Sequence, residues 1–358
     1  MSDKTEQVWS ILQKAGVVQG DTPENKDPDS PWFVKVLLGF SGWLAAIFII
    51  GFIGVGFEFI FNDKTLLGLV GIVMIGGAFV LLRISKNEFV EHLGLAASLA
   101  GQVLLVYAMF KIAGHKNELV VWVLLTLIQI ALVMLMPNFV HRAFSSFIAA
   151  VAFAMVFTEM EIPYVVGGFI MLFAALCWLN EFTYPRYMKK IRAAGYGLTL
   201  ALILLKGVTL FGFKSFGYYL SGKVTGFWTQ PWFGEIIIGI VTIFVVWSLL
   251  QRYGRTFNEH ITLILLIAAV LLCTVSVKIQ GITVGIVILL LGFSASNRVL
   301  LGLGIVSLLF YISTYYYLLD VTLLKKSQIL LIVGIDLLVI RWVILRVMPV
   351  EEEVNHAE

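Results

Sequence analysis

Long apolar runs follow one another along almost the whole chain, and they constrain its fold more than any other feature. A helix that crosses the hydrocarbon core of a bilayer needs roughly 20 apolar residues. Short connections separate the runs, except for the longer one before Trp232. The runs cover residues 33–61, 65–82, 88–112, 118–136, 139–158, 162–180, 189–212, 232–252, 258–277, 281–297, 299–319 and 326–347. We therefore predict an all-α fold, a polytopic transmembrane helical bundle of about 12 spans.

The composition agrees with a membrane protein and argues against several other classes. Charged residues make up 13% of the 358 residues, whereas a soluble domain usually carries about 25%. The formal net charge of +3 is too small to indicate a nucleic-acid partner, so the lipid bilayer is the partner that the sequence predicts. Cys177 and Cys273 each lie inside an apolar run, which predicts neither a disulfide framework nor a metal site.

Sequence motifs for the common enzyme chemistries are missing. The chain has no Walker phosphate loop, no H-E-x-x-H zinc pair and no G-x-S-x-G nucleophile elbow. We therefore predict a protein that is not an enzyme, with no catalytic residue, no metal ligand and no cofactor.

Basic residues predict the orientation of the chain, because cytoplasmic loops carry an excess of lysine and arginine. If the N-terminus is cytoplasmic, sixteen of the 25 basic residues fall on the cytoplasmic side, and every arginine is among them. Both termini are then cytoplasmic. The predicted organisation is a short N-terminal helix with a linker, a first transmembrane half, a cytoplasmic linker, a second transmembrane half and an acidic cytoplasmic tail: residues 1–32, 33–180, 181–192, 193–347 and 348–358.

Two segments of the chain resemble each other. They are "RISKNEFVEHLGLAASLAGQVLLVYAMFKIAG" (83–114) and "RYGRTFNEHITLILLIAAVLLCTVSVKIQG" (252–281). Each has an arginine, then Glu-His, an apolar run and Lys-Ile. This pattern predicts two parallel six-helix repeats, related by an axis along the membrane normal. Apolar helices also resemble one another by composition alone, and that explanation stays open.

Ionisable residues inside the predicted spans are candidates for function, because charge is costly in a bilayer. Asp336 lies near the middle of the last run, and Lys206 lies several residues from the outer end of the seventh. The two residues could lie at overlapping depths and form a pair. In the structural alternative, Asp336 is protonated or hydrogen-bonded to a neighbouring helix, and Lys206 extends to the surface. Gln102 and Gln129 are predicted to form hydrogen bonds between helices.

A tyrosine-rich stretch, "LFYISTYYYLLDVTLLKKSQILL" (309–331), lies at the predicted outer end of the eleventh span. Tyrosine is enriched at membrane interfaces, because its ring is apolar while its hydroxyl can stay in water. An aromatic belt at the outer surface is therefore one interpretation. The other is that these side chains contact a ligand at the outer face; its candidates are Tyr311, Tyr315, Tyr316 and Asp320.

Residues 300–341, "LLGLGIVSLLFYISTYYYLLDVTLLKKSQILLIVGIDLLVIR", resemble a bacterial family of polytopic membrane proteins known as domain of unknown function 4401. The segment "SPWFVKVLLGFSGWLAAIF" (30–48) is similar to the start of the same family. The resemblance implies a multi-pass protein of the bacterial inner (cytoplasmic) membrane. It also implies a second small membrane protein as a partner, since such proteins are often found together. The family brings no established activity, cofactor or catalytic residue.

Three functions are compatible with these features. The first is a transporter or permease of unknown substrate, with a site between the two halves near Asp336 and Lys206. The alternative is a non-catalytic membrane scaffold or envelope-assembly component that works with a partner membrane protein. An intramembrane enzyme ranks last, because the candidate groups lie at different predicted depths.

Overall fold

The computed structural model describes most of the chain. The described residues are 9–11, 13–16, 32–56, 62–84, 88–114, 117–210, 230–252, 260–276, 280–318 and individual positions between 322 and 342. Within these residues every regular element is a helix, and no strand is found. The predicted all-α fold is confirmed for this part of the chain.

The helices follow the predicted apolar runs in order. They are α2 (Trp32–Gly56), α4 (Lys64–Ile84), α5 (Glu88–Ala113), α6 (Glu118–Leu135), α7 (Phe139–Glu159), α8 (Val166–Leu179), η1 (Pro185–Tyr187), α9 (Met188–Leu210), α11 (Pro231–Arg252), α12 (His260–Ser276), α13 (Ile282–Ser294) and α14 (Arg298–Leu318). Among the described residues, six segments are long and apolar enough to cross a membrane; they lie in α4, α5, α6, α7, α9 with η1, and α11. The count of twelve spans stays a prediction, because most of residues 326–347 lie outside the described part.

Two of the predicted spans form shorter helices than expected. Helix α8 has 14 residues and α13 has 13, so each is about 20 Å long, against about 30 Å for a hydrocarbon core. Helix α8 begins only at Val166, after a turn at residues 163–165 that contains Pro163. Helix α13 follows Gly281, whose φ of 96° is a left-handed conformation that favours glycine.

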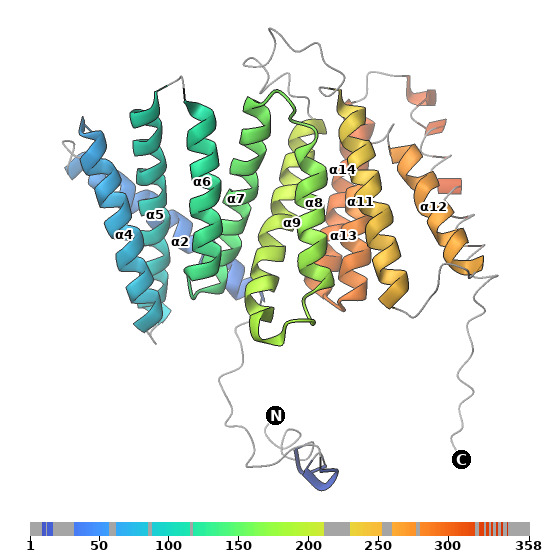
Figure 1. The fold of residues 1–358 in the computed structure, drawn as a ribbon, viewed down its shortest axis with the longest axis horizontal. Helices are drawn as coiled ribbons and strands as arrows, with labels where there is room; N and C mark the ends of the chain where they lie inside the picture. Colours follow the sequence, from blue (N-terminus) through green and yellow to red (C-terminus); the bar gives the residue numbers. More distant parts are fainter. Residues whose placement is uncertain are drawn as a thin grey trace.

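Most of the helices stand side by side, roughly parallel or antiparallel to one another, in one broad bundle, and α2 crosses them obliquely (Figure 1). Helix α5 packs against α2 and α4, and α6 packs against α7. Helix α9 packs against both α7 and α8, while α11 contacts α8, α12 and α13. Helices α13 and α14 form a further pair. These contacts join the early and late parts of the sequence into a continuous series, with α9 at its centre.

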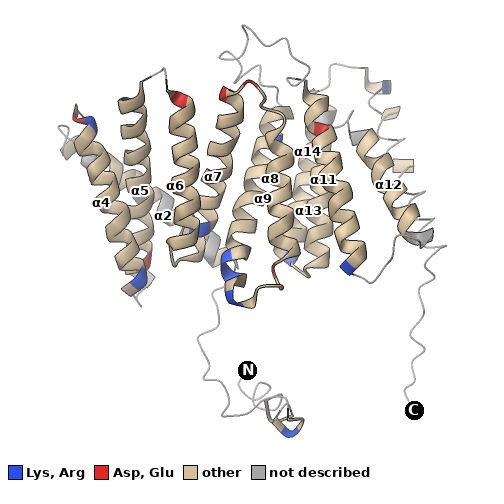
Figure 2. Ribbon diagram, in the orientation of Figure 1, with Lys and Arg blue, Asp and Glu red and all other residues tan. Residues whose placement is uncertain are grey.

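Charged residues lie at the ends of the helices, and the basic ones lie mainly at one end of the bundle (Figure 2). Arg83 lies in the last turn of α4 and Arg252 in the last turn of α11. Lys189 and Lys190 begin α9, and Arg298 begins α14. We call this end, where α4 and α11 finish and where α7, α9 and α14 begin, the basic end. The other end is the opposite end.

The segment expected as a linker, residues 181–192, is more ordered than the sequence suggested. It forms a turn, the 3₁₀ helix η1 and the first residues of α9. Glu181 is fully buried there, and its Oε1 lies 2.5 Å from the Arg192 guanidinium. The ion pair ties the start of α9 to the end of α8, so this connection is part of the folded bundle.

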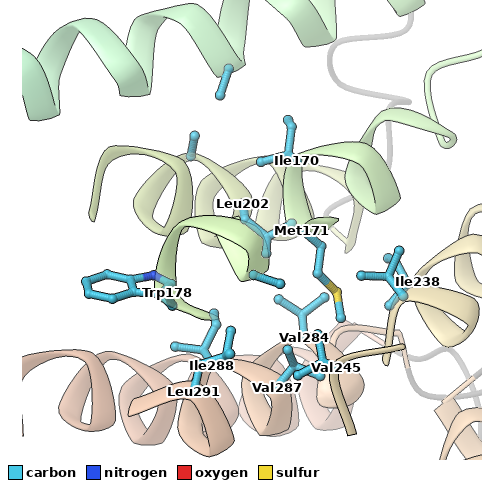
Figure 3. Close-up of a cluster of buried hydrophobic side chains, with 14 of the residues drawn as sticks. Ile170, Met171, Trp178, Leu202, Ile238, Val245, Val284, Val287, Ile288 and Leu291 are labelled. Atoms are coloured by element: carbon cyan, nitrogen blue, oxygen red, sulfur yellow. The ribbon is translucent and has the colours of Figure 1, made fainter. Parts of the chain in front are cut away.

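The largest hydrophobic cluster lies between α8, α9, α11 and α13 (Figure 3). Trp178 of α8 is its largest fully buried side chain. The indole fits because Gly195 of α9 has no side chain; a Cβ there would lie 2.9 Å from Trp178 Cε2. Trp178 Nε1 donates a hydrogen bond to Thr199 Oγ1 at 3.1 Å, so its polar atom is satisfied.

Helices α4 and α5 approach each other most closely where two glycines meet. A Cβ at Gly101 would lie 2.8 Å from Gly71 O and 2.8 Å from Met74 Cβ. Small residues allow such approaches, which favour helix association in membranes through van der Waals contact. By contrast, a Cβ at Gly76 of α4 would meet nothing within 4 Å.

We therefore expect Gly101→Ala to destabilise the protein and Gly76→Ala to leave it unchanged or slightly more stable. The first substitution overpacks a tight interface, which costs about 1–3 kcal/mol. The second improves helix propensity without a clash. Thermal unfolding of the two detergent-solubilised variants measures the difference. Equal unfolding temperatures would contradict the close approach of α4 and α5.

Candidate functional site

Two of the residues predicted as site residues, Asp336 and Asp320, lie outside the described part of the chain. Tyr315 lies in α14, but its side chain is likewise outside the described part. The hypothesis that Asp336 pairs with Lys206 therefore stays a prediction. Lys206, Tyr311 and Tyr316 can be placed.

Lys206 forms a buried ion pair with Glu235. Its Nζ donates a hydrogen bond to Glu235 Oε1, which joins α9 to α11. The Lys206 side chain is 9% exposed and that of Glu235 is 1% exposed. Lys206 lies four residues before the last residue of α9, and Glu235 lies four residues after the first of α11. Since both positions are about one helical turn from the opposite end, the pair lies just inside that end.

The ion pair is not fully satisfied. Within the described part of the chain, Glu235 Oε2 is buried and has no hydrogen-bond partner. Removing a carboxylate from water costs several kcal/mol, and one ion-pair partner compensates this cost only when the other lone pairs are satisfied too. Among the described residues, Glu181 Oε2 is likewise buried without a partner, in the connection between α8 and α9. Glu235 differs because it lies inside a candidate membrane span, where an ionisable residue is a candidate for function.

Tyr311 lies beside this pair. Its ring is fully buried, and its hydroxyl donates a hydrogen bond to the carbonyl of Ile203 at 3.3 Å, one turn before Lys206 on α9. The ring packs on Gly281, where a Cβ would lie 2.8 Å from Tyr311 Cγ. Tyr311 also lies within electrostatic range of the Glu235 carboxylate.

Cys273 of α12 is the fourth residue of this group. Its Sγ lies 3.8 Å from the carbonyl of Gly239, one turn after Glu235 on α11. It too lies within electrostatic range of the Glu235 carboxylate. We call Lys206, Glu235, Cys273 and Tyr311 the ion-pair site. Four helices, α9, α11, α12 and α14, supply its side chains.

The tyrosine stretch divides into two environments. Tyr316 and Tyr317 are 38% and 81% exposed, and their rings contact each other edge to face. Their exposure fits the aromatic belt. The aromatic-belt interpretation does not fit Tyr311, because its ring lies in the interior and its hydroxyl is hydrogen-bonded to a backbone carbonyl. One turn of helix separates a surface tyrosine from a core tyrosine.

A second group of polar side chains surrounds His141, near the start of α7. Ser98 Oγ lies 2.7 Å from His141 Nε2, and Gln102 Nε2 lies 3.2 Å from the same atom. Gln129 Nε2 donates to Gln102 Oε1 at 2.8 Å, which confirms the predicted hydrogen bond between helices α5 and α6. Ser145 Oγ lies 3.3 Å from His141 Nδ1. All five side chains are buried. We call them the histidine network.

The histidine network connects to a helix cap at the basic end. Asn138 is the N-cap of α7, and its Oδ1 accepts a hydrogen bond from the His141 backbone N–H at 3.0 Å. Its Nδ2 donates to Glu91 Oε1 of α5. Because Glu91 is half-buried, the chain of polar contacts begins near the surface and ends inside the bundle.

Two important residues were not found from the sequence. Glu235 lies near the start of its apolar run, where a glutamate is usually a partner of the helix dipole. His141 lies near the start of another run, in "PNFVHRAF", and a histidine at that place resembles a surface residue. Ser98 lies four residues before Gln102, and Ser145 lies four residues after His141, so each places a second polar group on the same helix face. This spacing is a signal in the sequence from which the polar cluster could have been predicted.

Potential metal ligands do not cluster in the described part of the chain. No group of three or more His, Cys, Asp or Glu side chains there could hold a metal ion.

Long apolar helices, charges at the helix ends and polar clusters between the helices define a multi-pass helical membrane protein. The chain belongs to the family described as "Domain of unknown function (DUF4401)", which matches residues 31–347. No curated protein and no solved structure matches the chain. The chemistry of the two sites therefore has to be argued from the chain itself.

Removing one partner of the ion pair should destabilise the protein more than removing both. Lys206→Met leaves the Glu235 carboxylate buried without a counter-charge, which costs about 3–5 kcal/mol in other proteins. The double variant Lys206→Met with Glu235→Gln removes both charges and should recover most of that loss. Thermal unfolding in detergent measures both variants. A double variant that is as unstable as Lys206→Met would show that the two groups do not depend on each other.

Proposed function

We propose that the protein is a membrane transporter or permease whose polar centre includes the ion-pair site. The observation that supports this proposal is the buried Lys206–Glu235 pair with an unpartnered carboxylate oxygen. Ionisable residues inside membrane bundles commonly mark the route of an ion or a substrate. A packed scaffold gains little from such a pair, because apolar side chains of similar volume are often at least as stable.

The position of the pair suggests how it would act. It joins α9 to α11, and Tyr311 and Cys273 bring α14 and α12 to the same place. A proton or cation that reaches Glu235 competes with the Lys206 ammonium for the carboxylate. Release of Lys206 would loosen the contact between α9 and α11, so the pair can work as a gate. A structural protein would instead keep this contact closed.

We further propose the setting in which this gate works. The protein lies in the inner membrane of a bacterium, with twelve spans and with both termini and the basic end in the cytoplasm, as the positive-inside rule indicates. The ion-pair site then faces the outer side. The two halves of the chain are parallel repeats, and the protein carries out no chemical reaction. Asp336 remains a candidate for the same pathway.

The alternative is a scaffold that works with a second membrane protein. It differs from a transporter in one measurable property, which is access of water to the ion-pair site. A transporter needs a hydrated route to the pair in at least one conformation. A scaffold keeps the pair dry.

Cys273 is a natural reporter of this access, because a thiol reacts as the thiolate and therefore needs water. In a Cys177→Ala background it is the remaining cysteine of the two. We expect a charged, membrane-impermeant methanethiosulfonate to modify Cys273 from the outer side. Adding Lys206→Gln should increase the rate of Cys273 modification about tenfold, because the contact between α9 and α11 is then open. The Glu235 carboxylate keeps its charge in this variant. Mass spectrometry of right-side-out and inside-out vesicles measures the extent and the side.

A matched control lies on the same helix. Leu271 is 55% exposed and, two residues away from Cys273, lies on another face of α12 that meets lipid. In a cysteine-free background, Leu271→Cys should therefore stay unmodified from both sides. If Cys273 is also unreactive from both sides, with and without Lys206→Gln in folded protein, the transporter proposal fails and the scaffold is favoured.

A further inference from the structure

The hydrogen bonds of the histidine network fit a neutral His141. Gln102 Oε1 accepts from Gln129, so the Gln102 amide presents its NH₂ group to His141 Nε2. An NH₂ group only donates, which makes Nε2 an acceptor without a proton. The ring proton then lies on Nδ1, where Ser145 Oγ can accept it. In this arrangement His141 is neutral.

A second arrangement of the same atoms accommodates one more proton. If the side-chain amides of Gln102 and Gln129 both rotate by 180°, their oxygen and nitrogen atoms exchange places. Gln102 Oε1 then faces His141 Nε2, and Gln102 Nε2 faces Gln129 Oε1. His141 can carry a proton on Nε2 and donate it to Gln102 Oε1 or to Ser98 Oγ. The hydrogen bond between Gln102 and Gln129 is replaced by its reverse, and the single Nε2 proton replaces the two contacts that Nε2 accepts in the neutral arrangement.

In the described part of the chain, one side-chain atom of the histidine network lacks a partner in the neutral arrangement. Gln129 Oε1 is buried and has no hydrogen-bond partner among the described residues, and Gln129 is 1% exposed. A buried amide oxygen without a donor is costly. The reversed arrangement gives this oxygen a donor, the NH₂ group of Gln102, and moves the Gln129 NH₂ group to the position without a partner. Each arrangement therefore leaves one Gln129 atom unpartnered, and the proton on His141 Nε2 decides between the two.

We infer that His141 is a proton-binding site inside the helical bundle, and that the amides of Gln102 and Gln129 reverse together when the proton binds. The proton comes from bulk solvent and adds to the Nε2 lone pair, so no other bond breaks. This inference does not rest on the proposed transport function. It concerns α5, α6 and α7, whereas the ion-pair site lies on α9, α11, α12 and α14.

The charged groups around His141 act in opposite directions. Glu91 of α5 favours the proton, and Asn138 links its carboxylate to the start of α7. Arg142, the next residue on α7, opposes it. Lys190 of α9 also opposes it from the basic end, where its Nζ donates to Met134 O of α6. The charge within α6 is Glu118, which lies at the opposite end.

The test is nitrogen-15 NMR of histidine side chains in the full chain, reconstituted in lipid bilayers. The chain has five histidines. The signal of His141 is identified by its loss in His141→Gln and by its survival in a variant that keeps only this histidine. We expect the Nδ1–H tautomer at high pH and a doubly protonated ring at low pH, with a midpoint between about pH 4 and about pH 8. The side-chain amide signals of Gln102 and Gln129 should shift at the same midpoint.

A substitution separates a coupled network from an isolated histidine. Gln102→Leu removes an acceptor of the charged ring, and a hydrogen bond to a charged donor is worth more than one to a neutral acceptor. We expect about a tenfold lower proton affinity of His141, a shift of about one pH unit. Thr242→Val, which removes a buried hydroxyl on α11, is the matched control and should leave the midpoint unchanged.

Three results would overturn the inference. They are a ring that stays neutral over the whole range, an Nε2–H tautomer at high pH, and amide signals that do not move with the ring. The last two are measured on the unsubstituted chain, so they hold even if Gln102→Leu does not fold. A midpoint that is the same in Gln102→Leu and Thr242→Val would show that His141 titrates without the amides.

Discussion

The interior of a bilayer offers no water to a polar side chain, so each such group has to find its partner inside the protein. This constraint explains why the polar residues of the described helices collect in a few places. Lys206 and Glu235 meet between α9 and α11, and Ser98, Gln102, Gln129 and His141 meet between α5, α6 and α7. Glu235 Oε2 and Gln129 Oε1 remain without a partner within these groups, and Glu181 Oε2 and Arg142 Nε are further examples in the described part of the chain. The packing of the helices therefore meets this constraint incompletely at several places, and both polar groups are among them.

Helix packing decides where these groups can form. Between helices in a membrane, association depends on van der Waals contact, and small residues permit the closest contact. Gly71 and Gly101 bring α4 and α5 together, while Gly195 receives the indole of Trp178 and Gly281 receives the ring of Tyr311. In the last two cases a glycine seats an aromatic ring beside polar atoms, next to Thr199 and next to the ion pair. At these two glycines, close helix packing and buried polar groups therefore occur together.

The sequence predicted the helices better than it predicted the sites. Apolar length located the helices, because twenty apolar residues in a row have few other uses. Turns at residues 163–165 and 295–296 make α8 and α13 shorter than predicted, and both turns are local features. The partner of Lys206 could not be predicted, because Glu235 is 29 residues away and only the packing of α9 on α11 brings the two together. The burial of Tyr311 depends in the same way on the neighbouring helices, since its neighbour Tyr316 has a similar sequence context and is exposed.

The two polar groups lie far apart along the bundle, and the contact between α7 and α9 separates them. Gly197 of α9 lies against the backbone of α7, where a Cβ would come within 2.7 Å of Ser146 Cβ. From this contact, His141 lies about one turn toward the basic end and Lys206 nine residues toward the opposite end, which places them roughly 20 Å apart. At that distance two unit charges interact by about 1 kcal/mol at an effective dielectric constant of about 20, and the Lys206–Glu235 pair has no net charge to respond with. Direct electrostatics is therefore too weak to couple the two groups. Any coupling therefore has to be carried by movement of α7 and α9. Ser146 Oγ of α7 donates a hydrogen bond to Ala194 O of α9, and the two helices also approach closely at Gly197. Both contacts favour movement of α7 and α9 as one body.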